Sequence, residues 1–133
     1  MSARQKVLTA RQAIDESITE AELQSAVVEL AQLRGWLVHH CRPGATAGGH
    51  WATQIQGDTG FPDLVLARGR GDDHPPELLF VEVKRERTEV TIAQGLWIRV
   101  LSEVAIAACD LTVEVFLWRP SDWSSGEIER RLA

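Results

Sequence analysis

The stretch LLFVEVKRE, residues 78–86, decides the fold of this chain. It is the most apolar run in its half of the chain, and it predicts a strand buried in the core. Successive side chains of a strand face opposite sides, so Glu82 and Lys84 share the face of Phe80. Two opposite charges therefore follow an apolar half of the strand. Three interpretations fit: a cross-strand ion pair at the sheet rim, a strand end that emerges into solvent, or a catalytic pair.

The preceding strand favours the catalytic interpretation. GFPD, residues 60–63, places Asp63 at the start of the predicted strand 63–68, and the turn-rich linker GRGDDHPPE predicts a hairpin with the next strand. Hairpin pairing brings Asp63 beside Glu82 at one rim. Two adjacent carboxylates repel each other but suit a hard cation such as Mg²⁺. A neighbouring lysine, Lys84, can stabilise hydroxide or charge that develops on a phosphate.

The remaining segments predict an α/β domain. In the first helix, apolar residues recur at helical spacing, with Thr19 as N-cap and Gly35 as stop: Leu23, Val27, Leu30 and Leu33. A long Gly-rich connection without periodicity then covers residues 42–60. Further elements are predicted as strands 36–41 and 111–118, a helix over 91–110, and a short C-terminal helix or turn over 121–132. This order predicts a mixed sheet with helices packed on it.

Composition is that of a globular chain of ordinary size. The 133 residues are 44% hydrophobic and 25% charged, which predicts one domain over 18–133, preceded by a tail or extra helix over 1–17. Two well-separated cysteines and the lack of a long apolar run predict a cytoplasmic protein without membrane segments. The net charge of −5 is unusual for a nucleic-acid binder. Arginines and bound divalent cations can nevertheless make the local charge positive at the surface that binds nucleic acid.

A family resemblance is carried by several motifs in order. The central ones are Pro62-Asp63 and Glu82-Val83-Lys84, and together they resemble the PD-(D/E)XK nuclease superfamily, in particular its phage-type VRR-NUC branch. The surrounding residues that match that branch are Glu20 and Gln24, Gly35-Trp36, Thr91, Gln94 and Trp97, and the late run VFLWRPSDW. The resemblance covers residues 19–123. One departure is the lack of glycine between the last helix and the last strand, which leaves the end of that helix open.

The resemblance implies a restriction-endonuclease-like αβββαβ core with a central mixed sheet flanked by helices. It implies a nuclease that hydrolyses DNA phosphodiester bonds with Mg²⁺ or Mn²⁺. Carried over by position, Asp63 and Glu82 are metal ligands, the backbone carbonyl of Val83 is a further ligand, and Lys84 positions or activates the attacking water. Gln94 is implied to support the catalytic site.

The first-helix contribution has two alternatives. Glu20 and Gln24 lie four residues apart on one flank of the apolar stripe, so both can point towards the site, and Glu20 is the preferred metal ligand. Glu22, on the other flank, is the alternative. Charges that are merely solvated on the helix surface remain an equal alternative for all three.

Other residues are candidates for contact with DNA. Arg42 and Trp51 in the long connection, and Arg85 after the catalytic strand, have the chemistry for phosphate contact or base stacking. Ordinary loop packing is the alternative for the first two. A zinc site at His39, His40 and Cys41 is disfavoured because alternate strand residues face opposite sides and no second ligand pair exists.

The predicted function is thus cleavage of branched, flapped or junction DNA, recognised by its shape, with a homodimer as the candidate assembly. Two other classes of function remain open. One is a non-catalytic nucleic-acid-binding module that keeps the nuclease fold. The other is a scaffold or interaction protein in which the charged residues form only an ion network at the rim.

Overall fold

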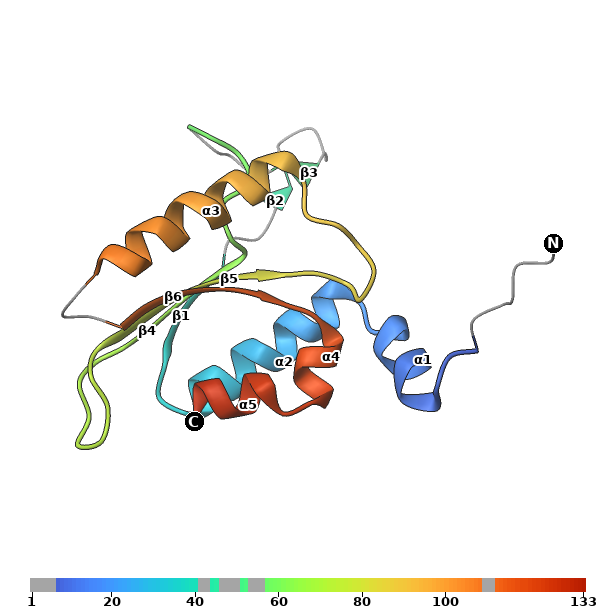
Figure 1. Ribbon diagram of the computed structural model, residues 1–133, viewed down its shortest axis with the longest axis horizontal. Coiled ribbons are helices and arrows are strands. Elements are labelled where there is room, and N and C mark those ends of the chain that lie inside the picture. Colours follow the sequence, from blue (N-terminus) through green and yellow to red (C-terminus); the bar gives the residue numbers. More distant parts are fainter. Residues whose placement is uncertain (1–6, 41–43, 46–50, 53–56, 109–111) are drawn as a thin grey trace.

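The structure is a computed structural model, and it describes residues 7–40, 44–45, 51–52, 57–108 and 112–133. Figure 1 shows helices on both faces of one central sheet. Along the chain the elements are α1 (Ala10–Ser17), α2 (Glu20–Leu33), β1 (Leu37–His40), β2 (Gly44–Ala45), β3 (Trp51–Ala52), β4 (Leu64–Arg68), β5 (Glu77–Val83), α3 (Ile92–Ala107), β6 (Thr112–Trp118), α4 (Pro120–Ser124) and α5 (Glu127–Leu132).

The central sheet has the strand order β1-β4-β5-β6 and is mixed. β4 pairs antiparallel with β1 and with β5, whereas β5 and β6 run parallel and are connected through α3. A crossover helix is the usual connection between parallel neighbours. This is the predicted αβββαβ order, and the predicted α/β fold with a helix-flanked mixed sheet is confirmed.

The core lies between the sheet and the helices on one of its faces. There α2, α4 and α5 cover the sheet, and α3 lies across the opposite face (Figure 1). Alternate residues of β5, Leu79, Val81 and Val83, are fully buried in this core. By contrast, no residue of α3 is fully buried. The face of β5 that carries Glu82 is therefore the face towards α3.

Several expected elements are refined by the structure. The stripe of α2 continues from Val27 to the buried Ala31, whereas Leu33 is 80% exposed, so its expected core position is wrong. Leu33 is the last residue of the helix and lies off the buried stripe. The long connection contains the short antiparallel pair β2 and β3. α3 ends at Ala107, and the C-terminal segment forms two short helices separated by Gly126, whose φ is 84°.

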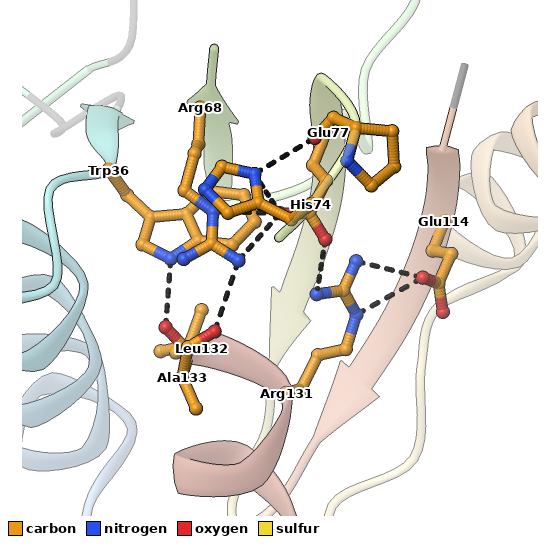
Figure 2. A network of polar contacts seen from close by, with 9 residues as sticks. Trp36, Arg68, His74, Glu77, Glu114, Arg131, Leu132 and Ala133 are labelled. Carbon is orange, nitrogen blue, oxygen red and sulfur yellow. Dashed lines mark hydrogen bonds and ion pairs between the residues drawn. The ribbon is translucent and has the colours of Figure 1, made fainter. Parts of the chain in front are cut away.

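A partly buried ionic network fixes α5 to the sheet (Figure 2). The carboxylate of Glu77, whose side chain is 8% exposed, accepts hydrogen bonds from Arg68 Nε at 2.7 Å and Arg131 Nη1 at 3.0 Å. The Arg68 guanidinium lies 4.4 Å from the ring centre of Trp36, whose Nε1 donates to Leu132 O at 3.1 Å. Arg68 ends β4 and Glu77 begins β5, so this network stabilises the end of the hairpin that is remote from Asp63 and Glu82.

In the described parts of the chain, no helix is both long enough and apolar enough to cross a membrane.

Candidate active site

Asp63 and Glu82 come together at the open end of the β4–β5 hairpin. Leu64 pairs with Val81 in the antiparallel register, and one further step along both strands sets Asp63 opposite Glu82. The Asp63 Oδ2 accepts a hydrogen bond from the backbone N–H of Val83 at 2.9 Å. This bond extends the pairing of the two strands past the last backbone pair. It also fixes the Asp63 carboxylate beside the end of β5.

Glu82 is a buried carboxylate with one unsatisfied oxygen. The residue is 2% exposed, and its Oε1 accepts a hydrogen bond from Gln94 Nε2 at 2.9 Å. Its Oε2 is buried and has no hydrogen-bond partner among the described residues. Burial, followed by the charge of Asp63, raises the pKa of Glu82 from 4.5 to about 8, while Lys84 opposes the increase. With both carboxyls ionised, Oε2 faces negative charge without a donor.

Gln94 reaches Glu82 because the start of α3 orients its amide group. Thr91 is the N-cap, and its hydroxyl accepts from Gln94 N at 3.2 Å. In return, Gln94 Oε1 accepts from Thr91 N at 2.9 Å, which completes a capping box. With the amide oxygen held by the backbone, the NH₂ group points to Glu82. The T-x-x-Q motif thus both begins the helix and supplies a donor to the acidic pair.

The turn before Asp63 packs directly on the first turns of α3. Gly60 has φ of 90°, and a Cβ at this position would lie 2.6 Å from Ala93 C and 2.7 Å from Gln94 N. Only glycine accommodates both this left-handed conformation and such a close approach. Trp97 Nε1 donates to Thr59 O at 3.0 Å and further fixes the turn. Asp63 and Gln94 are therefore held in one rigid unit, with Trp97 as its buttress.

Lys84 is buried beside the start of α2. It is 7% exposed, and its Nζ lies 3.8 Å from Glu20 Oε1. The interpretation of this strand end as one that emerges into solvent is thus wrong, because both Glu82 and Lys84 are buried. Glu22, the alternative to Glu20, is engaged in the capping box of α2, where its carboxylate accepts from the Thr19 hydroxyl at 2.9 Å. Of the two acids, Glu20 is the one that lies beside Lys84.

The structure places the remaining candidates away from the acidic pair or outside its description. Gln24 lines a pocket of about 200 Å³ between α2 and His40, and neither Asp63 nor Glu82 belongs to that lining. Arg42 lies outside the described residues. Trp51 is the first residue of β3, and its side chain is not described. Arg85 is exposed directly after Lys84, and its Nη2 donates to Glu16 O at 3.3 Å.

Arg119 is a supporting residue that sequence reasoning missed. Its Nη1 donates to the carbonyl oxygens of Arg85 at 2.6 Å, Glu86 at 3.2 Å and Thr88 at 2.8 Å. It follows β6 directly, where Trp118 O accepts from Lys84 N at 3.1 Å. One guanidinium thus fixes the backbone that leaves Lys84. The arginine of the run WRPSD was visible in the sequence, but its partners are backbone atoms, which leave no side-chain pattern.

The donor set fits a hard divalent cation. Within the described residues, no three His, Cys, Asp or Glu side chains are grouped to hold a metal by themselves. Asp63 and Glu82 form a pair, and Mg²⁺ commonly takes one or two carboxylates and keeps several waters. A cation here would satisfy the buried Glu82 Oε2 and offset both the burial and the nearby charge of Asp63, which raise the pKa of Glu82. Neither a structural ion pair nor an exposed strand end explains that orphaned oxygen.

Comparison with protein families matches residues 5–115 to the VRR-NUC domain. The chain belongs to the VRR-NUC family. Family membership indicates a nuclease-like function in DNA processing, and nucleases of this type typically use divalent metals. The match begins before the motifs recognised in the sequence and ends within β6, so the VRR-NUC domain includes α1. It does not separate phage members from others, and the phage-type assignment stays a prediction. Searches of curated proteins and of solved structures found no match.

Proposed function

We propose that this protein is a metal-dependent nuclease that hydrolyses DNA phosphodiester bonds with Mg²⁺ or Mn²⁺. The observation that supports this most strongly is Glu82: a fully buried carboxylate beside Asp63, with one oxygen left without a donor among the described residues. Such an arrangement is costly without a cation. A purely structural role for Glu82 would bring no stabilisation that offsets this cost. The family match supports the same chemistry.

Each residue of the site has a distinct proposed role. Asp63 and Glu82 hold the cation, with the Val83 carbonyl as a further ligand. Glu20 does not form a group of three carboxylates with this pair, so its proposed contribution from α2 acts through Lys84, whose Nζ lies 3.8 Å from Glu20 Oε1. When bound, the cation supplies a polarised water and stabilises charge on the phosphoryl group. Lys84 positions that water and offsets negative charge on the phosphate.

Gln94 acts through Glu82. Its amide donates to Glu82 Oε1 at 2.9 Å and leaves Oε2 as the oxygen available to a cation. It thereby fixes the orientation of the carboxylate.

The substrate we propose is branched, flapped or junction DNA, recognised by shape. The catalytic unit is residues 18–133, with α1 attached to it. The attachment is specific, because the buried Asp15 of α1 accepts a hydrogen bond from Ser124 Oγ of α4 at 2.8 Å. Shape, set by which phosphates can reach the site together, is the simplest selector.

The homodimer we propose uses the outer face of α3. Leu96, Val100 and Val104 form a stripe on this helix and are 52%, 42% and 58% exposed. In a two-fold antiparallel pairing centred near Val100, Leu96 of one copy meets Val104 of the other. Exposed Arg99 and Glu103 lie one turn apart on one flank of the stripe, so each can reach the opposite charge on the second copy. An apolar stripe flanked by self-complementary charges fits a second copy of this chain.

Sedimentation of Val100→Asp tests the dimer. The wild type should sediment as a dimer and this variant as a monomer, whereas Leu33→Asp, at an exposed apolar position on α2, should remain dimeric. A wild-type monomer at tens of micromolar would overturn the assembly.

The decisive test of function is a cleavage panel. Flaps, splayed arms, four-way junctions and plain duplex are incubated with Mg²⁺ or Mn²⁺, with and without EDTA. We expect metal-dependent cleavage that favours branched substrates and is abolished in Lys84→Ala, with Arg130→Gln on the exposed face of α5 unaffected. Binding without cleavage would instead favour a non-catalytic module. Neither DNA binding nor a calorimetric signal for divalent ions would favour a scaffold.

A further inference from the structure

The loop between β5 and α3 follows Lys84 and is fixed from its inner side. Arg119 binds the carbonyls of Arg85, Glu86 and Thr88, and the Glu86 carboxylate accepts from Ser121 N at 3.0 Å at the start of α4. These bonds use the inward-facing polar groups of the loop. Its backbone is therefore held in one shape while its two arginine side chains project outwards.

The outward side of this loop forms a pocket lined by two arginines and two glutamates. The pocket has a volume of about 220 Å³ and is lined by Glu16, Arg85, Glu86, Arg87 and Thr88. Both Arg85 and Arg87 are exposed. Together with Lys84 they place three cationic side chains within four residues, in a chain whose net charge is −5. Because the Glu86 carboxylate is bound by Ser121 N and Lys84 is buried beside Glu20, Arg85 and Arg87 are the cations that this loop exposes to solvent.

One residue, Glu16, contacts both arginines, Arg87 through its carboxylate and Arg85 through its backbone carbonyl. The Glu16 carboxylate pairs with Arg87 Nε, and the Glu16 carbonyl accepts from Arg85 Nη2 at 3.3 Å. The Arg87 side chain is 66% exposed, and exposed ion pairs contribute little to stability. Helix α1 is independently attached through the buried Asp15. The Glu16 contact is therefore not needed to hold α1 in place.

We propose that Arg85 and Arg87 bind a DNA backbone phosphate beside the scissile one, and that the Glu16 carboxylate occupies this phosphate site when DNA is absent. The inference rests on the proposed nuclease function. Guanidinium groups recognise phosphate and carboxylate through the same donor geometry, so one can replace the other. Arg87 lies three residues beyond Lys84, a span of at most about 11 Å in an extended chain. Because Arg87 follows Lys84 so closely in the chain, a phosphate bound there belongs to the nucleotides that flank the cleaved bond.

The test compares Arg87→Gln with Glu16→Gln. If the two residues formed only a structural ion pair, both substitutions would change DNA binding in the same direction. Binding of a fluorescein-labelled four-way junction is measured by anisotropy over a range of salt concentrations, in Ca²⁺ to suppress cleavage. Arg87→Gln should weaken binding about 5- to 10-fold and reduce the salt slope by about 1, because one phosphate contact is lost. Glu16→Gln should tighten binding by about 3-fold, because the competing anion is removed.

The control is Arg130 with Glu127, another exposed arginine–glutamate ion pair, which lies on α5. Arg130→Gln and Glu127→Gln should leave binding unchanged. If Glu16→Gln weakens binding or has no effect, the inference is wrong, and this variant decides the question even where Arg87→Gln fails to fold. Opposite effects of the two substitutions without any cleavage by the wild type in Mn²⁺ would support the phosphate site and overturn the nuclease. Cleavage by the wild type, without opposite effects of the two substitutions on binding, would support the nuclease and overturn the phosphate site.

Discussion

The raised pKa of Glu82 predicts how the stability of the metal-free protein depends on pH. Its pKa is about 8 in the folded chain, against 4.5 as the ordinary value, with burial and then Asp63 as the main causes. Glu82 thus stabilises the folded state below pH 4.5, and this contribution is lost as pH rises through 8. At about 1.4 kcal/mol per pKa unit, the loss between pH 5 and pH 8 is about 3 kcal/mol. Glu82→Gln keeps the shape of the side chain and does not titrate.

Urea unfolding of wild type and Glu82→Gln, in EDTA at pH 5, 6, 7 and 8, measures this difference. The variant should gain stability relative to the wild type as pH rises, by about 3 kcal/mol over the range. Mn²⁺ at pH 8 should raise the stability of the wild type and leave the variant unchanged, because ligand binding stabilises only the state that binds it. A difference between the two proteins that stays flat from pH 5 to pH 8 refutes the reasoning.

Three further predictions concern the support of the site. Gly60→Ala should lower the thermal midpoint by several degrees and reduce cleavage at least tenfold, because the Cβ of the new alanine would meet backbone atoms of α3. The control is Gly69→Ala, where an added Cβ has nothing within 4 Å, and this variant should match the wild type in both measurements. Gln94→Glu should reduce kcat far more than binding, because a third carboxylate then faces Glu82 Oε1; an unchanged kcat would contradict the proposed orientation. Arg119→Gln should reduce kcat, since three carbonyl bonds of the loop after Lys84 are lost, and Arg119→Lys should restore part of it; equal losses in both would show that the guanidinium has no special role.

The meeting of Asp63 and Glu82 was predictable because it follows from local rules. A turn-rich linker predicts a hairpin, and antiparallel pairing then places the start of one strand beside the end of the next. The orientation of Gln94 was also within reach, because T-x-x-Q before an apolar run is a capping-box signature. In the sequence, Thr91 and Gln94 stand out first as residues of the family motif, and the capping box gives the same two residues a local structural role.

The burial of Glu82 and Lys84 could not be predicted in the same way. Strand alternation shows which residues share a face, but it does not show how completely distant elements cover that face. Here the covering elements are the first turn of α3 and the start of α2, through Gln94 and Glu20. The hydrogen bonds of Arg119 could not be predicted either, because its side chain binds carbonyl oxygens 31 to 34 residues earlier in the chain. Pairs of that kind depend on tertiary packing and not on sequence spacing.

The central claim is that the acidic pair holds a cation used to cleave DNA, and metal-dependent cleavage by an Asp63→Asn variant tests it most directly. The rate of cleavage of a labelled four-way junction is measured against Mn²⁺ concentration for the wild type and for this variant, with folding verified by circular dichroism. We predict a wild-type rate that saturates with Mn²⁺ and is lost in EDTA, and no cleavage by Asp63→Asn at concentrations that saturate the wild type. Wild-type cleavage in EDTA, or equal rates for the two proteins in Mn²⁺, would contradict the claim.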